Sequence, residues 1–293
     1  MRRTLLALLT LLLLLLLPAS SRARKITRDE RAASLQYVQS LQNPDGGFRP
    51  TAVAAPSTLG ATVGGLRAFR YWGKTAPQAS RCREFIRSCR QEDGSFADTP
   101  TGTPDARSTA MGLMVLAELK EEMESYVGPA LLWFREKART QPDVYIAAAA
   151  LDAVRVQAKD TDGWQKLFLA TRNGDGTFGK TPGDSARAAI TLLRLTGNLT
   201  HREAVAEQVA GAQNRSDGGF PGAAGTSDLA ATYPMMRACF LLRARPDLAG
   251  VRRFVAACRN SDGGYGPAPG QPSTLSTTYF AAIVSHWLDE MEK

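Results

Sequence analysis

Apolar residues in this chain recur mainly at helical spacing, and stretches that alternate like a β-strand are nearly absent. Residues 32–41 are typical, because Tyr37, Val38 and Leu41 fall on one face of a helix and glutamine and serine side chains on the other. The pattern predicts an all-α protein.

A short phrase of Asp, Gly, a small residue and an aromatic residue follows these runs. Its five copies are Asp45-Gly46-Gly47-Phe48, Asp93-Gly94-Ser95-Phe96, Asp175-Gly176-Thr177-Phe178, Asp217-Gly218-Gly219-Phe220 and Asp262-Gly263-Gly264-Tyr265. The steps between successive Asp residues are 48, 82, 42 and 45. The long step is close to twice 41, so we expect six units of about 44 residues, the third without its phrase.

The phrase has the chemistry of a helix stop. Its Asp can bond the backbone of a tight turn, its Gly tolerates a positive φ, and its aromatic residue can pack beneath the turn. An alanine-rich second helix follows in each unit, at about residues 57–71, 105–119, 144–157 and 277–288 in the clearest cases. Thr27 and Thr200, each with Glu three residues later, predict capping boxes for two first helices. We interpret the phrase as structural, not as a binding site.

The end of the chain indicates that the units close on themselves. An open array of repeats normally ends in a polar capping repeat, yet the last helix is as apolar as the middle ones. We therefore expect an α/α toroid, a closed ring of six helix pairs with the second helices lining a central cavity.

Residues 1–23 have the composition of a signal peptide. Arg2 and Arg3 precede an apolar run at 5–17, and small residues follow it. That run is shorter than the roughly 20 residues of a membrane span, and no later run is long enough. We expect residues 24–293 to form the toroid domain of a secreted or otherwise extracytoplasmic protein. An uncleaved N-terminal anchor is the alternative.

Charge and cysteine content narrow the function little. The net charge is +8, but no basic run is interleaved with aromatic residues, so we expect no nucleic-acid partner. The chain has two histidines, His201 and His286, which we interpret as surface or packing residues. Its cysteines are expected to be buried thiols, although disulfides between units are an alternative; they are Cys82, Cys89, Cys239 and Cys258.

Residues 42–48, 213–220 and 259–265 resemble the prenyltransferase and squalene-oxidase repeat. With the alanine-rich helices that follow, they look like the β subunits of protein prenyltransferases, especially the geranylgeranyl type. The resemblance covers about residues 27–287. It implies a toroid with an apolar, isoprenoid-sized funnel, and transfer of an isoprenoid group as the activity. It leaves a partner subunit open.

The resemblance also implies a catalytic zinc, held in the family by an Asp-x-Cys pair and a His. Asp228 matches the Asp, but Ala230 stands in place of the Cys and Thr277 near the place of the His. Catalytic zinc generally has three protein ligands, so we predict no cofactor and assign no catalytic residue. The Asp-x-Asp-Asp motif of related cyclases is absent as well.

A set of polar residues near the starts of the second helices remains as a candidate ligand site. Arg107 and Arg187 could hold a diphosphate or a carboxylate, and Tyr145, Tyr233 and Tyr279 could line the funnel beside them. Rim charges and core tyrosines are the alternative. The sequence thus supports a prenyltransferase-like enzyme acting on an isoprenoid or other apolar chain, or a non-catalytic toroid that binds a lipid or a protein.

The expected signal peptide has a direct test. Because small residues ending at Ala23 follow the short apolar run, the mature chain should begin near Arg24. Mass spectrometry of the secreted protein should find this start, and an intact Met1 would contradict it.

Overall fold

The computed structural model describes residues 24–157, 161–222 and 224–293, which form twelve helices and only isolated β-bridges. The expected signal peptide at 1–23 lies outside the described residues. None of the helices in these ranges has the length and hydropathy of a membrane span. The outer helices are α2 (Arg28–Ser40), α4 (Ala79–Ser88), α6 (Glu124–Lys137), α8 (Asp162–Leu169), α10 (Arg202–Gly211) and α12 (Leu248–Ala257). The inner helices are α3 (Leu59–Tyr71), α5 (Ala106–Glu118), α7 (Gln141–Ala153), α9 (Pro182–Thr196), α11 (Leu229–Leu242) and α13 (Leu275–Met291).

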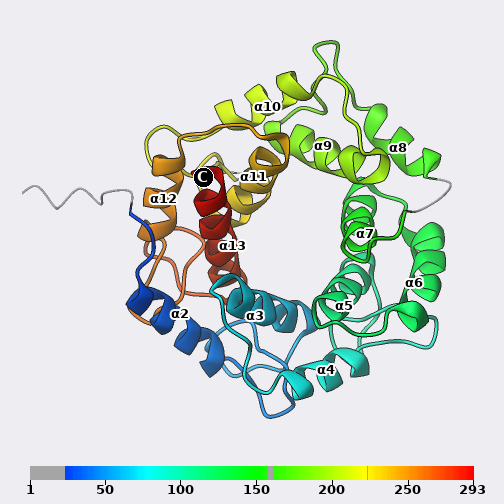
Figure 1. Ribbon diagram of the computed structural model, residues 1–293, viewed down its shortest axis with the longest axis vertical. Helices are drawn as coiled ribbons and strands as arrows, with labels where there is room; N and C mark the ends of the chain where they lie inside the picture. Colours follow the sequence, from blue (N-terminus) through cyan, green and yellow to red (C-terminus); the bar gives the residue numbers. More distant parts are fainter. Residues whose placement is uncertain (1–23, 158–160, 223) are drawn as a thin grey trace, which may run out of the picture.

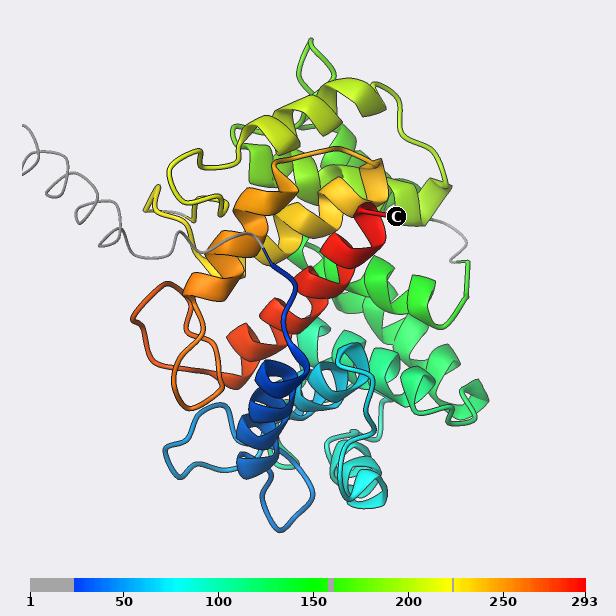
Figure 2. The same cartoon turned by 60° about the vertical axis from the view of Figure 1, so that its left-hand side comes forward.

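The helices form two concentric layers, and the predicted closure of the ring is confirmed (Figure 1). Each inner helix packs on the next, and α13 packs on α3. In the turned view of Figure 2, α13 in red runs beside the first helices in blue. Lys25 and Arg31 add ion pairs to Asp289 of α13, at 3.6 and 3.8 Å. Within the described residues, the first and last units therefore cover each other.

The five Asp-Gly turns are built alike, and their structural interpretation agrees with the contacts. In each, Asp Oδ1 accepts the backbone N–H two residues later, at 2.8–3.0 Å. The Gly has φ between 86° and 89°. The aromatic side chain is at most 1% exposed. Each phrase thus ends a helix and buries a large side chain.

A hydrogen bond that was not predicted from the sequence joins each turn to its inner helix. The backbone N–H of the aromatic residue donates to a Thr or Ser hydroxyl at 2.9–3.1 Å. The acceptors are Thr62, Thr109, Ser185, Thr232 and Thr278, each four residues after the N-cap of its helix. Unit three has Val144 at this position, after the N-cap Thr140, and also lacks the Asp-Gly phrase. The phrase and its hydroxyl partner are present or absent together.

The glycine of each turn also packs against the next outer helix. A Cβ on Gly218 would lie 2.2 Å from the backbone oxygen of Gly250 in α12. In the last unit, a Cβ on Gly263 would lie 2.5 Å from the oxygen of Ala33 in α2. Ser34 Oγ donates to the Gly263 carbonyl at 2.7 Å. The turn of unit six therefore closes the ring with the contact that joins the other units.

Two capping boxes were predicted, and only the first is confirmed. Thr27 and Glu30 exchange the expected hydrogen bonds, at 3.2 and 2.9 Å. The second was wrong, because α10 begins at Arg202 and its N-cap, His201, has a left-handed φ of 56° and no side-chain cap. His201 takes this conformation where its side chain packs on Gly176 of the preceding turn. Packing between units overrides the local signal.

The four cysteines are free and buried, as the first interpretation held. Burial raises the pKa of the Cys89, Cys239 and Cys258 thiols to about 12. These side chains behave as small apolar core residues.

The joint between a turn and its inner helix can be tested in unit five. Thr232→Val removes the only hydroxyl that accepts from the buried Phe220 N–H, so it should cost about 1–3 kcal/mol of unfolding free energy. Phe220→Ala should cost about 3–5 kcal/mol through the cavity it leaves. Denaturant titration measures both, with the exposed Thr226→Val as control. If Thr232→Val had the same denaturation midpoint as the wild-type protein, the role of the hydroxyl would be contradicted.

Ring closure can be tested with two glycines of positive φ. Gly73 has φ of 74° and open space around its Cβ position, so Gly73→Ala should cost about 1–2 kcal/mol of backbone strain. Gly263→Ala has similar strain and also a clash with α2, which should add about 1–3 kcal/mol. Equal losses of stability in the two variants would show that the last turn does not bear on the first unit.

Candidate functional site

The residues expected at a zinc site do not form one. Asp228 is the N-cap of α11, and its Oδ1 accepts the Ala231 N–H at 2.6 Å. Ala230 offers a methyl group, and the buried Thr277 hydroxyl donates to the Tyr265 carbonyl. Within the described ranges no group of three His, Cys, Asp or Glu side chains is placed to hold a metal. The donor set therefore does not fit the zinc implied by the resemblance.

Arg107 and Arg187 are exposed near the N-terminal ends of α5 and α9, which α7 separates in the inner ring. Arg187 Nη1 is 3.9 Å from Asp184 Oδ1. His286 is also exposed, with its ring 5.3 Å from that of Tyr71. The structure does not bring the two arginines together, and their role in binding stays a prediction.

The three expected tyrosines, in contrast, lie within one cluster. The Tyr233 hydroxyl is 3.4 Å from that of Tyr279, and their ring centroids are 5.8 Å apart. Tyr145 lies beneath the guanidinium of Arg194, at 5.9 Å from its ring centroid. Arg237 lies 5.8 Å from the Tyr233 centroid. The tyrosines therefore belong to a group of inner-helix residues that includes two further arginines.

An aromatic stack runs along the contact between α11 and α13. Tyr233 is stacked on Phe280 at 4.5 Å and on Trp287 at 5.7 Å, and Trp287 is stacked on Phe240 at 6.1 Å. Tyr233 and Phe280 are half-buried and Phe240 is 37% exposed, so the stack is not sealed in the core. We call these four residues the aromatic stack.

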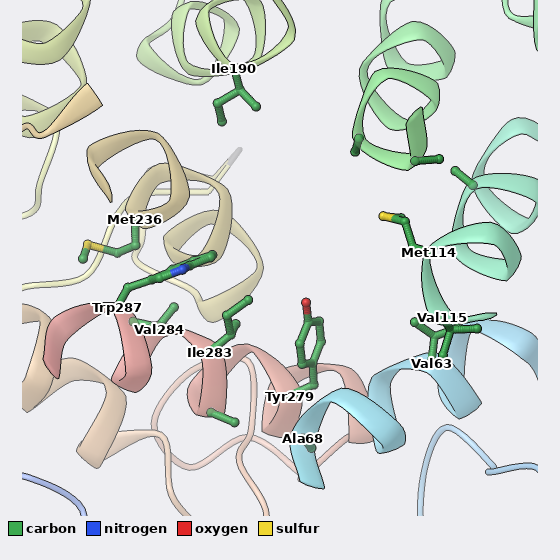
Figure 3. Close-up of a cluster of buried hydrophobic side chains, with 14 of the residues drawn as sticks. Val63, Ala68, Met114, Val115, Ile190, Met236, Tyr279, Ile283, Val284 and Trp287 are labelled. Atoms are coloured by element: carbon green, nitrogen blue, oxygen red, sulfur yellow. The ribbon is translucent and has the colours of Figure 1, made fainter. Parts of the chain in front are cut away.

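Side chains from several inner helices converge on the ring axis. Figure 3 shows Tyr279 of α13, Met114 of α5 and Ile190 of α9 pointing toward the same central region. Arg194 follows Ile190 by four residues and Arg237 follows Tyr233 by four, so each arginine shares a helix face with a side chain of this group. The inner face of the ring is thus apolar and aromatic, with arginines one turn further along.

Electrostatics separate the two hydroxyls of the tyrosine pair. Burial alone would raise the pKa of Tyr233, but the Arg237 charge and the Tyr279 hydroxyl hold that pKa below its usual value. Burial and the neighbouring Tyr233 raise the pKa of Tyr279 well above its usual value.

A third arginine of the inner face is neutralised. Arg67 Nη2 is 2.6 Å from Glu118 Oε1 across the contact of α3 and α5, and Arg70 is 3.4 Å from the same carboxylate. The Glu118 carboxylate is therefore the counter-ion of these two arginines.

A groove of about 910 Å³ lies between the loops of units one and two. Its polar residues include Asn43, Asp45 and Ser57, which already bond one another within the turn of unit one. These three side chains are therefore engaged in the turn itself.

The predicted site residues did not include Arg67, Arg194 or Arg237. Arginine side chains are mostly exposed in folded proteins, so none of these three was expected on the inner face. The available signal was an arginine four residues after an apolar or aromatic residue within an alanine-rich second helix.

The sequence model of the prenyltransferase alpha-alpha toroid domain matches residues 2–192 and 143–292. The chain belongs to the prenyltransferase α/α toroid family. No curated protein matches the sequence.

Solved structures agree on the fold of this toroid. A geranylgeranyltransferase-I from Candida albicans, complexed with GGPP, is 16% identical with a TM-score of 0.63, covering 77% of this chain and 82% of that one. The type II terpene cyclase MstE from Scytonema is 12% identical with a TM-score of 0.60, covering 90% and 97%. A protein from Actinoplanes is 15% identical with a TM-score of 0.62, covering 90% and 99%. At these identities the likeness establishes the fold alone.

Proposed function

We propose that the toroid binds an isoprenoid-type apolar chain inside the ring, as a prenyltransferase-like protein that does not use the zinc of the family. The observation that carries the proposal is the aromatic stack between α11 and α13, continued by Tyr279. Flat aromatic faces suit the methyl branches and double bonds of an isoprenoid, and ligand pockets are mainly apolar with few polar groups.

Several features support a ligand instead of a purely packed interior. Tyr145, Tyr233 and Phe280 keep exposed surface, although they lie on the inner layer of a two-layer ring. Met111 of α5 is half-buried as well. Burial of this surface by an apolar chain would be favourable at about 25 cal/mol for each Å² covered.

Transfer of the isoprenoid is the finer part of the proposal. With Ala230 and Thr277 in place of the ligands, an acceptor thiol would have no zinc to hold it as a thiolate. The acceptor would therefore have to bring its own nucleophile, such as an already ionised group. The location outside the cytoplasm that residues 1–23 suggest belongs to the same proposal.

A second candidate function is a non-catalytic toroid that carries a lipid or binds a protein. The observation that favours it is the donor set at Asp228, where the one retained ligand is already engaged as a helix cap. A lipid-carrying toroid would share the bound chain with the first candidate and differ from it in turnover.

Binding can be measured by displacing a fluorescent geranylgeranyl diphosphate analogue with unlabelled geranylgeraniol, which has the chain without the charge. Tyr233→Leu and Trp287→Leu should each weaken geranylgeraniol binding about threefold to tenfold, because each removes a stacked aromatic face. Trp133→Leu, on the outer helix α6, is the matched control and should bind normally.

The outcomes separate the candidates. Absence of binding by the wild-type protein, or binding that the two variants leave unchanged, would refute the chain site. Release of pyrophosphate from geranylgeranyl diphosphate in the presence of an acceptor would support transfer, and binding without release would support the non-catalytic toroid.

A further inference from the structure

Arg194 of α9 is a buried cation whose hydrogen bonds are incomplete. Its side chain is 9% exposed, and its Nε and Nη1 atoms are buried without a hydrogen-bond partner. The nearest carboxylate oxygen, Asp152 Oδ2, is 3.5 Å from Nε and belongs to a side chain that is 62% exposed. Burying a hydrogen-bond donor without an acceptor is costly, so a native protein seldom does so without a functional reason.

Arg237 on the adjacent helix α11 has no carboxylate partner at all within the described part of the chain. Its guanidinium contacts two aromatic faces, Tyr233 at 5.8 Å and Trp287 at 5.7 Å. Burial and the positive charge of Arg237 together lower the pKa of Arg194. The two cations therefore act on each other without a counter-ion between them.

Two other buried arginines of this chain are paired with carboxylates. Arg67 is paired with Glu118 at 2.6 Å. Arg252, with 5% of its side chain exposed, binds Asp289 at 2.7 Å and Glu292 at 2.8 Å. Among the described arginines with an unpartnered buried nitrogen, only Arg194 has one at a terminal Nη atom. The open pair on α9 and α11 can therefore take a counter-ion from outside the chain.

We propose that Arg194 and Arg237 bind the phosphate-type headgroup, of the diphosphate class, of an amphiphilic ligand. The assignment rests on the proposed function, since the aromatic stack beside Arg237 would hold the apolar part of the same molecule. Two guanidinium groups carry two positive charges, which a diphosphate matches and a single carboxylate does not. Guanidinium also binds phosphate oxygens bidentately.

The position of this site is distinctive. Arg237 lies nine residues after Asp228, and Arg194 thirteen after Thr181, the N-caps of their helices. At 1.5 Å per residue, these are roughly 13 and 20 Å along the helix axis. The headgroup would thus lie toward the C-terminal ends of the inner helices, away from Asp228, Arg107 and Arg187 at the N-terminal ends. It would not use the residues that the sequence suggested.

Calorimetry with three probes tests the pair: inorganic pyrophosphate, geranylgeranyl diphosphate and geranylgeraniol. The wild-type protein should bind pyrophosphate, and should bind the diphosphate more tightly than the alcohol. Arg194→Met and Arg237→Met should each lower the affinity for pyrophosphate and for geranylgeranyl diphosphate about tenfold or more. Both variants should leave the affinity for geranylgeraniol nearly unchanged. Arg215→Gln, which removes one charge from an exposed loop, is the control and should change neither.

Thermal stability separates a ligand-binding arginine from a structural one. Without ligand, Arg194→Met should melt at or above the wild-type temperature, because it removes a buried cation with unmade hydrogen bonds. Arg67→Met should melt lower, since it leaves Glu118 with only the more distant Arg70. A large loss of stability in Arg194→Met would assign that arginine to the C-terminal dipole of α9 and overturn the proposal.

Three binding results would also overturn it. Unchanged diphosphate binding in both methionine variants would exclude the pair. Loss of diphosphate binding only in an Arg107→Gln, Arg187→Gln double variant would place the headgroup at the other mouth. If a C20 isoprenoid carboxylate bound as tightly as geranylgeranyl diphosphate, the assignment to the diphosphate class would be refuted. If the protein failed to bind geranylgeraniol but still bound pyrophosphate through these arginines, the site for the apolar chain would be refuted. The same result would support the anion site.

Discussion

The hydrogen bond from the buried aromatic N–H to an inner-helix hydroxyl is the contact on which the ring depends. Turning the chain sharply after an outer helix buries a backbone donor together with a large side chain. A buried N–H needs a hydrogen-bond acceptor. A hydroxyl four residues into the next helix meets this need in all five turns.

Unit three shows what the ring tolerates when the joint is missing. It has Val144 where the others have a hydroxyl, and no Asp-Gly turn between α6 and α7. Its inner helix still packs on α5 and on α9. Because a closed ring supports each inner helix from both sides, the loss of one joint leaves the layer intact. The same loss at the end of an open array would expose an apolar face.

Closure of the ring also sets the electrostatics of its inner face. Charges there are removed from most of the surrounding water, so each needs a partner within reach. Arg67 has Glu118, whereas Arg194 and Arg237 have aromatic faces and one distant carboxylate. Membership of the prenyltransferase toroid family accounts for the ring of helix pairs. It does not account for the pair of arginines in the C-terminal halves of α9 and α11, whose one carboxylate contact is from Arg194 to Asp152.

Local chemistry was enough to predict much of this protein. Helical spacing of apolar residues, the Asp-Gly turns, the buried aromatic residues and the apolar last helix led to a closed ring of helix pairs, because each depends on neighbours in the sequence. Three features depended on packing between distant helices. The hydroxyl partners of the turns, the left-handed His201 and the environment of Arg194 and Arg237 are decided by which residues the ring brings together. From the sequence alone, an arginine is predicted to be exposed. Only the tertiary structure determines whether a carboxylate, an aromatic face or neither of them lies opposite its guanidinium.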